Sequence, residues 1–165
     1  MKHFVGKHIP KTTEGIFGQD DAVQQLRKFI MNFAHGKKKS ALIYGPSGTG
    51  KTSSAYALAS ELELEVVEVN ASDFRNADQI NSIIGNSIKQ RSLFSKGKII
   101  LVDEMDGLSG SQDRGGIQAL AKLLHESHYP IIITATDPFD NKFGSLRSKP
   151  ILIEYKPLDN NSILK

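Results

Sequence analysis

The order of apolar and helical segments predicts an α/β fold, with a five-stranded parallel sheet and helices on both of its faces. Five short apolar runs alternate with helical stretches along the chain of 165 residues, an order typical of parallel sheets. The apolar runs are continuous rather than alternating with polar residues, which is expected where both faces of a strand are covered. A glycine-rich turn connects the first run to the helix after it.

Each predicted strand is a short run of aliphatic and β-branched residues that ends at polar or turn-forming residues. In residues 98–103, four apolar residues lead directly into acids. The strands are predicted at residues 40–44, 65–70, 98–103, 130–134 and 151–155.

Most of the predicted helices repeat apolar residues every three or four positions, which places them on one face. For the first helix, Asp20 is the expected N-cap and Gly36 is expected to end the helix. The second helix, which follows the glycine-rich turn, is expected to begin near Lys51. The helices are predicted at residues 20–34, 51–62, 78–88 and 117–124.

The composition indicates one soluble domain, with 39% hydrophobic and 24% charged residues. No apolar run is long enough to cross a bilayer, and the first residues show no signal peptide, so we expect a cytoplasmic protein. The chain has no cysteine, which excludes disulfides, thiol nucleophiles and cysteine-based zinc sites. The net charge of +3 permits nucleic-acid contact without requiring it. The basic run at residues 37–39 fits a solvated loop better than a DNA contact.

The strongest motif matches G-x-x-x-x-G-K-[ST] in full and lies between a predicted strand and a predicted helix. Glycines let the backbone wrap around phosphate so that several N–H groups point inward, and the helix start adds its positive end. Lys51 should reach the β- and γ-phosphates, and the Thr52 hydroxyl should bind Mg²⁺. The sequence therefore predicts a P-loop that takes ATP and Mg²⁺. Its residues are Gly45, Pro46, Ser47, Gly48, Thr49, Gly50, Lys51 and Thr52.

The strand at residues 98–103 ends in Asp103, and Glu104 follows it. Both acids lie at the end of the sheet where open α/β folds bind ligands. Asp103 is expected to hold the Mg²⁺ together with Thr52, and Glu104 to act as general base on the attacking water. An adjacent glutamate favours a hydrolase over a P-loop kinase.

A third polar cluster follows the strand at residues 130–134. Thr136 has the chemistry to hydrogen-bond the γ-phosphate or its water, which would make it catalytic. Simple strand termination before Pro138 explains it equally well. His125 and His128 are one residue too close for a metalloprotease zinc motif and are interpreted as helix-surface residues.

Taken together, these motifs resemble the clamp loaders of the AAA+ class, and in particular the large subunit of archaeal replication factor C. The resemblance covers nearly the whole chain, from about Pro10 to Leu158. Besides the P-loop, it rests on Phe-Gly-Gln at residues 17–19, Asn-Ala-Ser-Asp at 70–73, Asp-Glu-Met-Asp-Gly at 103–107, Asp-Arg-Gly-Gly-Ile-Gln-Ala-Leu at 113–120 and Thr-Ala-Thr-Asp-Pro-Phe-Asp at 134–140.

The resemblance implies an ATPase that opens a ring-shaped sliding clamp and loads it on primer–template DNA, working beside small subunits. The segment Phe17-Gly18-Gln19 would then lie near the adenine, with Phe17 and Gly18 among the residues that bind the nucleotide. Residues 1–155 would form the nucleotide-binding domain and 156–165 a linker, with the family's helical lid absent. In the family each ATP lies at a subunit interface, so an arginine for this site would come from a partner subunit. This chain would not itself supply such an arginine to a neighbour, because Ser-Lys-Pro at residues 148–150 replaces the small subunits' Ser-Arg-Cys.

Other positions differ from the family or suggest partner contacts. Thr136 replaces an asparagine, and residues 8–11 read His-Ile-Pro-Lys instead of Tyr-Arg-Pro-Lys. Leu93 and Phe94 are either exposed anchors for the clamp or caps of the local core. Arg75 and Arg114 are candidate contacts to DNA phosphates.

Two alternatives remain at this point. Another AAA+ remodeller, such as a helicase loader, would share the P-loop and the two acids but not residues 70–73 and 113–120. A nucleotide-dependent scaffold that does not hydrolyse ATP alone would fit the missing lid and the missing arginine.

Overall fold

The computed structural model describes residues 10–71, 82, 96–108 and 114–158. Within them, five parallel strands form one sheet with the order β2-β3-β4-β1-β5, which confirms the predicted fold class. The strands are β1 (Ser40–Tyr44), β2 (Leu64–Asn70), β3 (Gly97–Asp103), β4 (Ile131–Ala135) and β5 (Ile151–Glu154).

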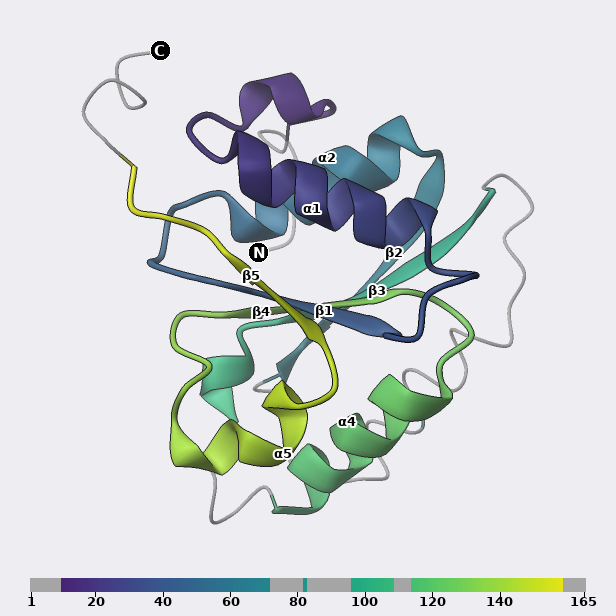
Figure 1. Ribbon diagram of the computed structural model, residues 1–165, viewed down its shortest axis with the longest axis vertical. Helices are drawn as coiled ribbons and strands as arrows, with labels where there is room; N and C mark the ends of the chain where they lie inside the picture. The colour runs from purple at the N-terminus through teal and green to yellow at the C-terminus, as the bar shows by residue number, and fades with distance from the viewer. Residues whose placement is uncertain (1–9, 72–81, 83–95, 109–113, 159–165) are drawn as a thin grey trace.

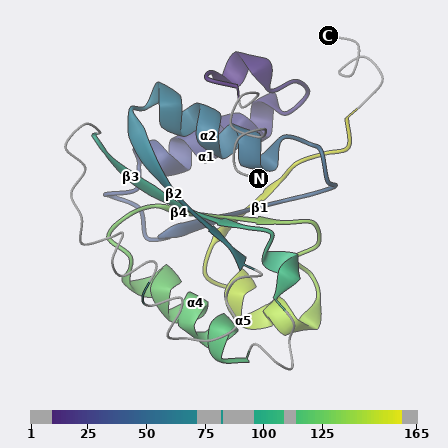
Figure 2. The same cartoon turned by 180° about the vertical axis from the view of Figure 1, so that it is seen from behind.

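Helices form a layer on each face of the sheet. Helices α1 (Asp20–Met31) and α2 (Lys51–Glu61) cover one face, and α4 (Arg114–Glu126) and α5 (Gly144–Arg147) cover the other (Figures 1 and 2). Strand β3 contributes side chains to the cores on both faces of the sheet, because successive strand residues point to opposite faces. Its Ile99 and Leu101 join the core with α1 and α2, while Ile100 and Val102 join the core with α4 and α5. This double burial explains why the apolar runs are continuous.

Strand β1 is an internal strand of the sheet, so the glycine-rich turn follows the carboxyl end of an internal strand. Strand β1 pairs with β4 on one side and β5 on the other, while α2 carries the chain away to β2 at the far edge of the sheet. In open α/β sheets, ligands bind beyond the carboxyl ends of the strands where such connections diverge.

The first helix differs from its prediction at both ends. Gln19 is the N-cap, so the expected cap Asp20 instead lies in the first turn, where its negative charge suits the helix start. The helix ends at Met31. Gly36 closes a later turn, in which its N–H donates to the Asn32 carbonyl at 2.9 Å.

Other differences involve short or weakly patterned segments. Helix α4 begins at Arg114, three residues before its prediction, and His125 is exposed on it, whereas His128 is exposed beyond its end. The sequence did not predict α5 or the 3-10 turns η2 (Thr13–Gly15), η4 (Met105–Gly107) and η5 (Asn141–Phe143). The helix predicted at residues 78–88 lies almost entirely outside the described residues.

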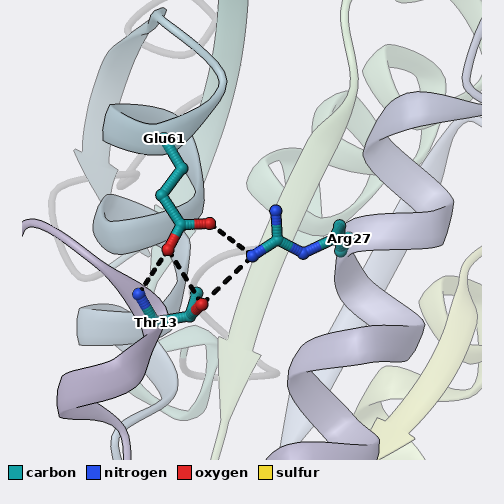
Figure 3. Close-up of polar contacts among 3 residues, drawn as sticks. All are labelled: Thr13, Arg27 and Glu61. Atoms are coloured by element: carbon teal, nitrogen blue, oxygen red, sulfur yellow. Dashed lines mark hydrogen bonds and ion pairs between the residues drawn. The ribbon is translucent and has the colours of Figure 1, made fainter.

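A polar network ties the N-terminal segment to the first two helices (Figure 3). One oxygen of Glu61, the last residue of α2, accepts hydrogen bonds from the Thr13 N–H at 2.6 Å and the Thr13 hydroxyl at 2.9 Å. Arg27 of α1 forms an ion pair with the other oxygen and donates to the Thr13 hydroxyl at 3.1 Å. This network holds η2 against α1 and α2.

Candidate functional site

The P-loop connects β1 to α2, as the sequence predicts, and its first glycine cannot carry a side chain. Gly45 has a φ of +143°, and a Cβ built there would lie 2.0 Å from the Tyr155 carbonyl oxygen. At the other end, Gly50 has a φ of +89° and serves as the N-cap of α2. Both positions need the left-handed region that glycine adopts without strain. The loop is therefore held in a closed turn at the start of a helix.

Lys51 lies over this loop. Its ammonium donates to the carbonyl oxygens of Gly45 at 2.7 Å and Pro46 at 2.8 Å. Burial lowers the pKa of Lys51, while the negative charges of Asp106 and Asp103 act in the opposite direction. A cation placed this way is available to an anion that enters the loop.

The two predicted metal ligands are neighbours. The Thr52 hydroxyl donates to one oxygen of Asp103 at 2.9 Å. The same carboxylate oxygen accepts from the Thr134 hydroxyl at 2.5 Å. Hydroxyl and carboxylate oxygens are the donors that Mg²⁺ takes, usually with phosphate and water completing its shell. The described residues contain no group of three His, Cys, Asp or Glu side chains suited to a metal.

Glu104 has an unusual backbone. Its φ of +57° and ψ of +53° lie in the left-handed region, which is uncommon for a residue other than glycine and is often found at functional sites. Its N–H donates to the Thr134 hydroxyl at 2.9 Å, and its exposed carboxylate accepts from the Asn70 amide at 3.2 Å. Thr134 thus contacts both acids. Its hydroxyl accepts from the backbone N–H of Glu104 and donates to the carboxylate of Asp103.

Thr136 lies exposed just after β4, and its contact is through the backbone. Its N–H donates to one oxygen of Asp106 at 2.5 Å, and the Asp137 N–H donates to the other at 3.3 Å. Among the described residues, no hydrogen bond joins the Thr136 hydroxyl to either acid. The hydroxyl that contacts the acids is that of Thr134, two residues earlier.

Phe17 and Gly18 lie in the segment between η2 and α1, beside the P-loop. The side chain of Ile16, just before them, would be 3.4 Å from a Cβ at Gly50. Phe17 is 44% exposed, unusual for a large aromatic side chain, and Gly18 has a φ of +71°. The segment therefore passes the end of the P-loop at Gly50.

A comparison with protein families identifies this architecture. Residues 41–149 match the family model described as "ATPase family associated with various cellular activities (AAA)". The chain belongs to the AAA family.

Two of the most similar relatives of this AAA domain come from archaea. It is 52% identical over 153 residues to the replication factor C large subunit of Nanoarchaeum equitans. The aligned region covers 92% of this chain and 36% of the relative. Identity to the same subunit of Staphylothermus marinus is 44% over 160 residues, covering 96% of this chain and 38% of the relative. The resemblance inferred from the motifs is confirmed, and the chain spans little more than a third of these relatives. No helix in the described part of the AAA domain is long and apolar enough to span a membrane.

Sequence reasoning did not assign site roles to Asn70, Thr134 and Asp106. Asn70 pairs in register with Asp103, because β2 and β3 are adjacent parallel strands. Thr134 comes from β4, the other neighbour of β3. The available signal was a polar residue at the carboxyl end of each predicted strand, since all such ends meet at one edge of a parallel sheet.

The structure does not describe the side chains of the predicted partner contacts. Arg75, Leu93 and Phe94 fall outside the described residues. Arg114 is the first residue of α4, and the structure describes its backbone alone.

Proposed function

We propose that this AAA domain binds ATP with Mg²⁺ and hydrolyses it as part of a clamp loader. The observation that carries the proposal is the 2.9 Å contact between Thr52, at the P-loop, and Asp103, with Glu104 directly after it. It brings the expected phosphate, metal and base groups of a P-loop hydrolase to one edge of the sheet.

Each side chain has a role in this proposal. The P-loop N–H groups and Lys51 would bind the phosphates, and Thr52 and Asp103 would hold Mg²⁺, which offsets phosphate charge when bound. Glu104 would accept a proton from the attacking water, with Asn70 and Thr134 fixing its side chain and backbone. Phe17 and Gly18 would border the base, and Thr136 remains a candidate contact to the γ-phosphate.

The proposed partners follow from the relatives, whose name places them in replication factor C. We propose that the chain acts beside clamp-loader small subunits, which would supply an arginine to its nucleotide. Leu93 and Phe94 are the proposed contacts to a sliding clamp. Arg75 and Arg114 are those proposed for phosphates of primer–template DNA.

Two variants test the reaction. Lys51→Ala should abolish binding of a fluorescent ATP analogue, because the phosphates lose their cation. Glu104→Gln should keep that binding and lose ATP turnover, measured with small subunits, clamp and primed DNA, because an amide cannot take the proton. Glu63→Gln, an exposed change in an ion pair with Lys96, is the matched control and should behave as wild type.

The outcomes separate the candidate functions. Unchanged turnover in Glu104→Gln would remove the general-base assignment. Binding without turnover in the complete mixture would favour a nucleotide-dependent scaffold. Turnover that is independent of clamp and DNA would favour another AAA+ remodeller.

A further inference from the structure

Gln19 has a side chain that does not serve the helix it precedes. It is the N-cap of α1, yet it makes no side-chain capping bond, and it is only 3% exposed. Its amide nitrogen donates to the Lys156 carbonyl at 2.7 Å, and its amide oxygen accepts from the Lys156 N–H at 3.2 Å. Both halves of the amide are therefore paired with the backbone of one residue, 137 positions away.

Lys156, which Gln19 holds, directly follows Tyr155, which contacts the P-loop. Tyr155 is fully buried. Its N–H donates to the Tyr44 carbonyl at 2.7 Å, and its own carbonyl oxygen occupies the space that a Cβ on Gly45 would need. A shift of the chain at Lys156 would thus be transmitted to the first glycine of the loop.

Ile16, three residues before Gln19 in the sequence, lies at the opposite end of the same loop. Its side chain would be 3.4 Å from a Cβ built at Gly50. A pocket of about 340 Å³ is lined by Gly18, Gln19, Glu154 and Lys156 together with the first turn of α1. The segments at residues 16–19 and 155–156 therefore border both ends of the P-loop, and the Gln19 amide joins them.

We propose that Gln19 is a positioning residue for the nucleotide, which fixes the two bordering segments at the spacing that the bound nucleotide requires. This inference rests on the proposed function. Glutamine suits the role because its amide offers a donor and an acceptor at once. A glutamate carboxylate would instead face the Lys156 carbonyl without a proton to donate.

The test compares two sets of polar contacts that hold the same N-terminal segment. Gln19→Met keeps the length of the side chain and removes both hydrogen bonds to Lys156. Arg27→Met removes the Arg27 contacts to Glu61 and Thr13, which hold the start of the segment away from Gln19 (Figure 3). For each variant, the dissociation constant of a fluorescent ADP analogue with Mg²⁺ is measured well below the melting temperature, and the melting temperature is measured without nucleotide.

We expect Gln19→Met to weaken binding of the analogue at least about tenfold, because both hydrogen bonds are lost and the Lys156 N–H and carbonyl are left unpaired. Arg27→Met should lower the melting temperature and leave the dissociation constant within about threefold of wild type. Wild-type affinity in Gln19→Met, or equal weakening in both variants, would overturn the inference. Failure of the wild-type chain to bind the analogue, by contrast, would overturn the proposed function itself.

Discussion

At the residue scale, two P-loop glycines share a positive φ but differ in their surroundings. Gly45 has a φ of +143° and lies against the Tyr155 carbonyl, whereas Gly48 has a φ of +79° and no atom within 4 Å of where a Cβ would lie. An added methyl group meets backbone strain at both positions and a collision only at Gly45. The close approach at Gly45 joins β1, the P-loop and the end of β5.

The pair gives a direct test of that close approach. Gly48→Ala should cost about 1–2 kcal/mol of stability, the usual cost of a left-handed conformation for a residue with a Cβ. Gly45→Ala should cost more than 3 kcal/mol, since a Cβ at 2.0 Å forces the backbone of β5 to move. Thermal or denaturant unfolding without nucleotide provides the measurement. Equal losses in the two variants would mean that the contact with Tyr155 does not constrain the loop.

Single residues also mark how far the sequence predicts the site. Lys51, Thr52, Asp103 and Glu104 belong to contiguous motifs, so their candidacy was visible in the sequence. The role of Thr134 was not, because it depends on β4 being adjacent to β3, and strand order is not encoded in a local pattern. The resemblance to the family placed Gln19 in the segment near the adenine, but its contact with Lys156 could not be predicted, since that partner is far away in the sequence.

At the scale of elements, predictions held where burial on both sides leaves a strong pattern. The strands match within one residue at each end, because their residues feed two cores. Phe33 continues the apolar pattern of α1 beyond its end at Met31, and it still contacts Phe29 edge-on, with ring centroids 6.3 Å apart. Packing is thus kept while the backbone leaves the helix, which a periodicity argument cannot detect. Helix α5 has four residues, too few to show a period.

The network between elements in Figure 3 predicts an acid-sensitive contribution to stability. Burial raises the pKa of Glu61, but hydrogen bonds from Thr13 and the charge and hydrogen bond of Arg27 outweigh it, so the pKa is lowered overall from 4.5. A carboxylate with a lowered folded-state pKa stabilises the fold above its unfolded value, and this stabilisation is lost as the pH falls through the folded value. Glu61→Gln should therefore cost about 1–2 kcal/mol at pH 7 and little once the pH is well below 4.

The control for this prediction is Glu63→Gln. Glu63 pairs with Lys96 at 3.0 Å, but both side chains are more than 60% exposed, and exposed pairs contribute little. Unfolding by denaturant at several pH values measures both variants against wild type. A cost for Glu61→Gln that does not change with pH would show that packing, rather than the ionised carboxylate, makes the contribution.

At the scale of the whole molecule, the proposed nucleotide site is made from both ends of the described chain and from its centre. Residues 16–19, the P-loop, the ends of β2, β3 and β4, and residues 155–156 all meet at one edge of the sheet. A ligand held there contacts segments that separate when the chain unfolds. Nucleotide binding should therefore stabilise the fold as a whole.

The size of this effect follows from mass action. At 100 times its dissociation constant, ADP with Mg²⁺ should add about 2.7 kcal/mol, which for a domain of this length raises the melting temperature by about 5–10 °C. Chelating the Mg²⁺ should reverse part of the increase, because Thr52 and Asp103 would then face the phosphates without a cation between the carboxylate and phosphate charges. Lys51→Ala should show no increase at the same nucleotide concentration, while its melting temperature without nucleotide stays near that of wild type. An equal increase in Lys51→Ala would place the bound nucleotide somewhere other than the P-loop, because a ligand stabilises only through the site that it occupies.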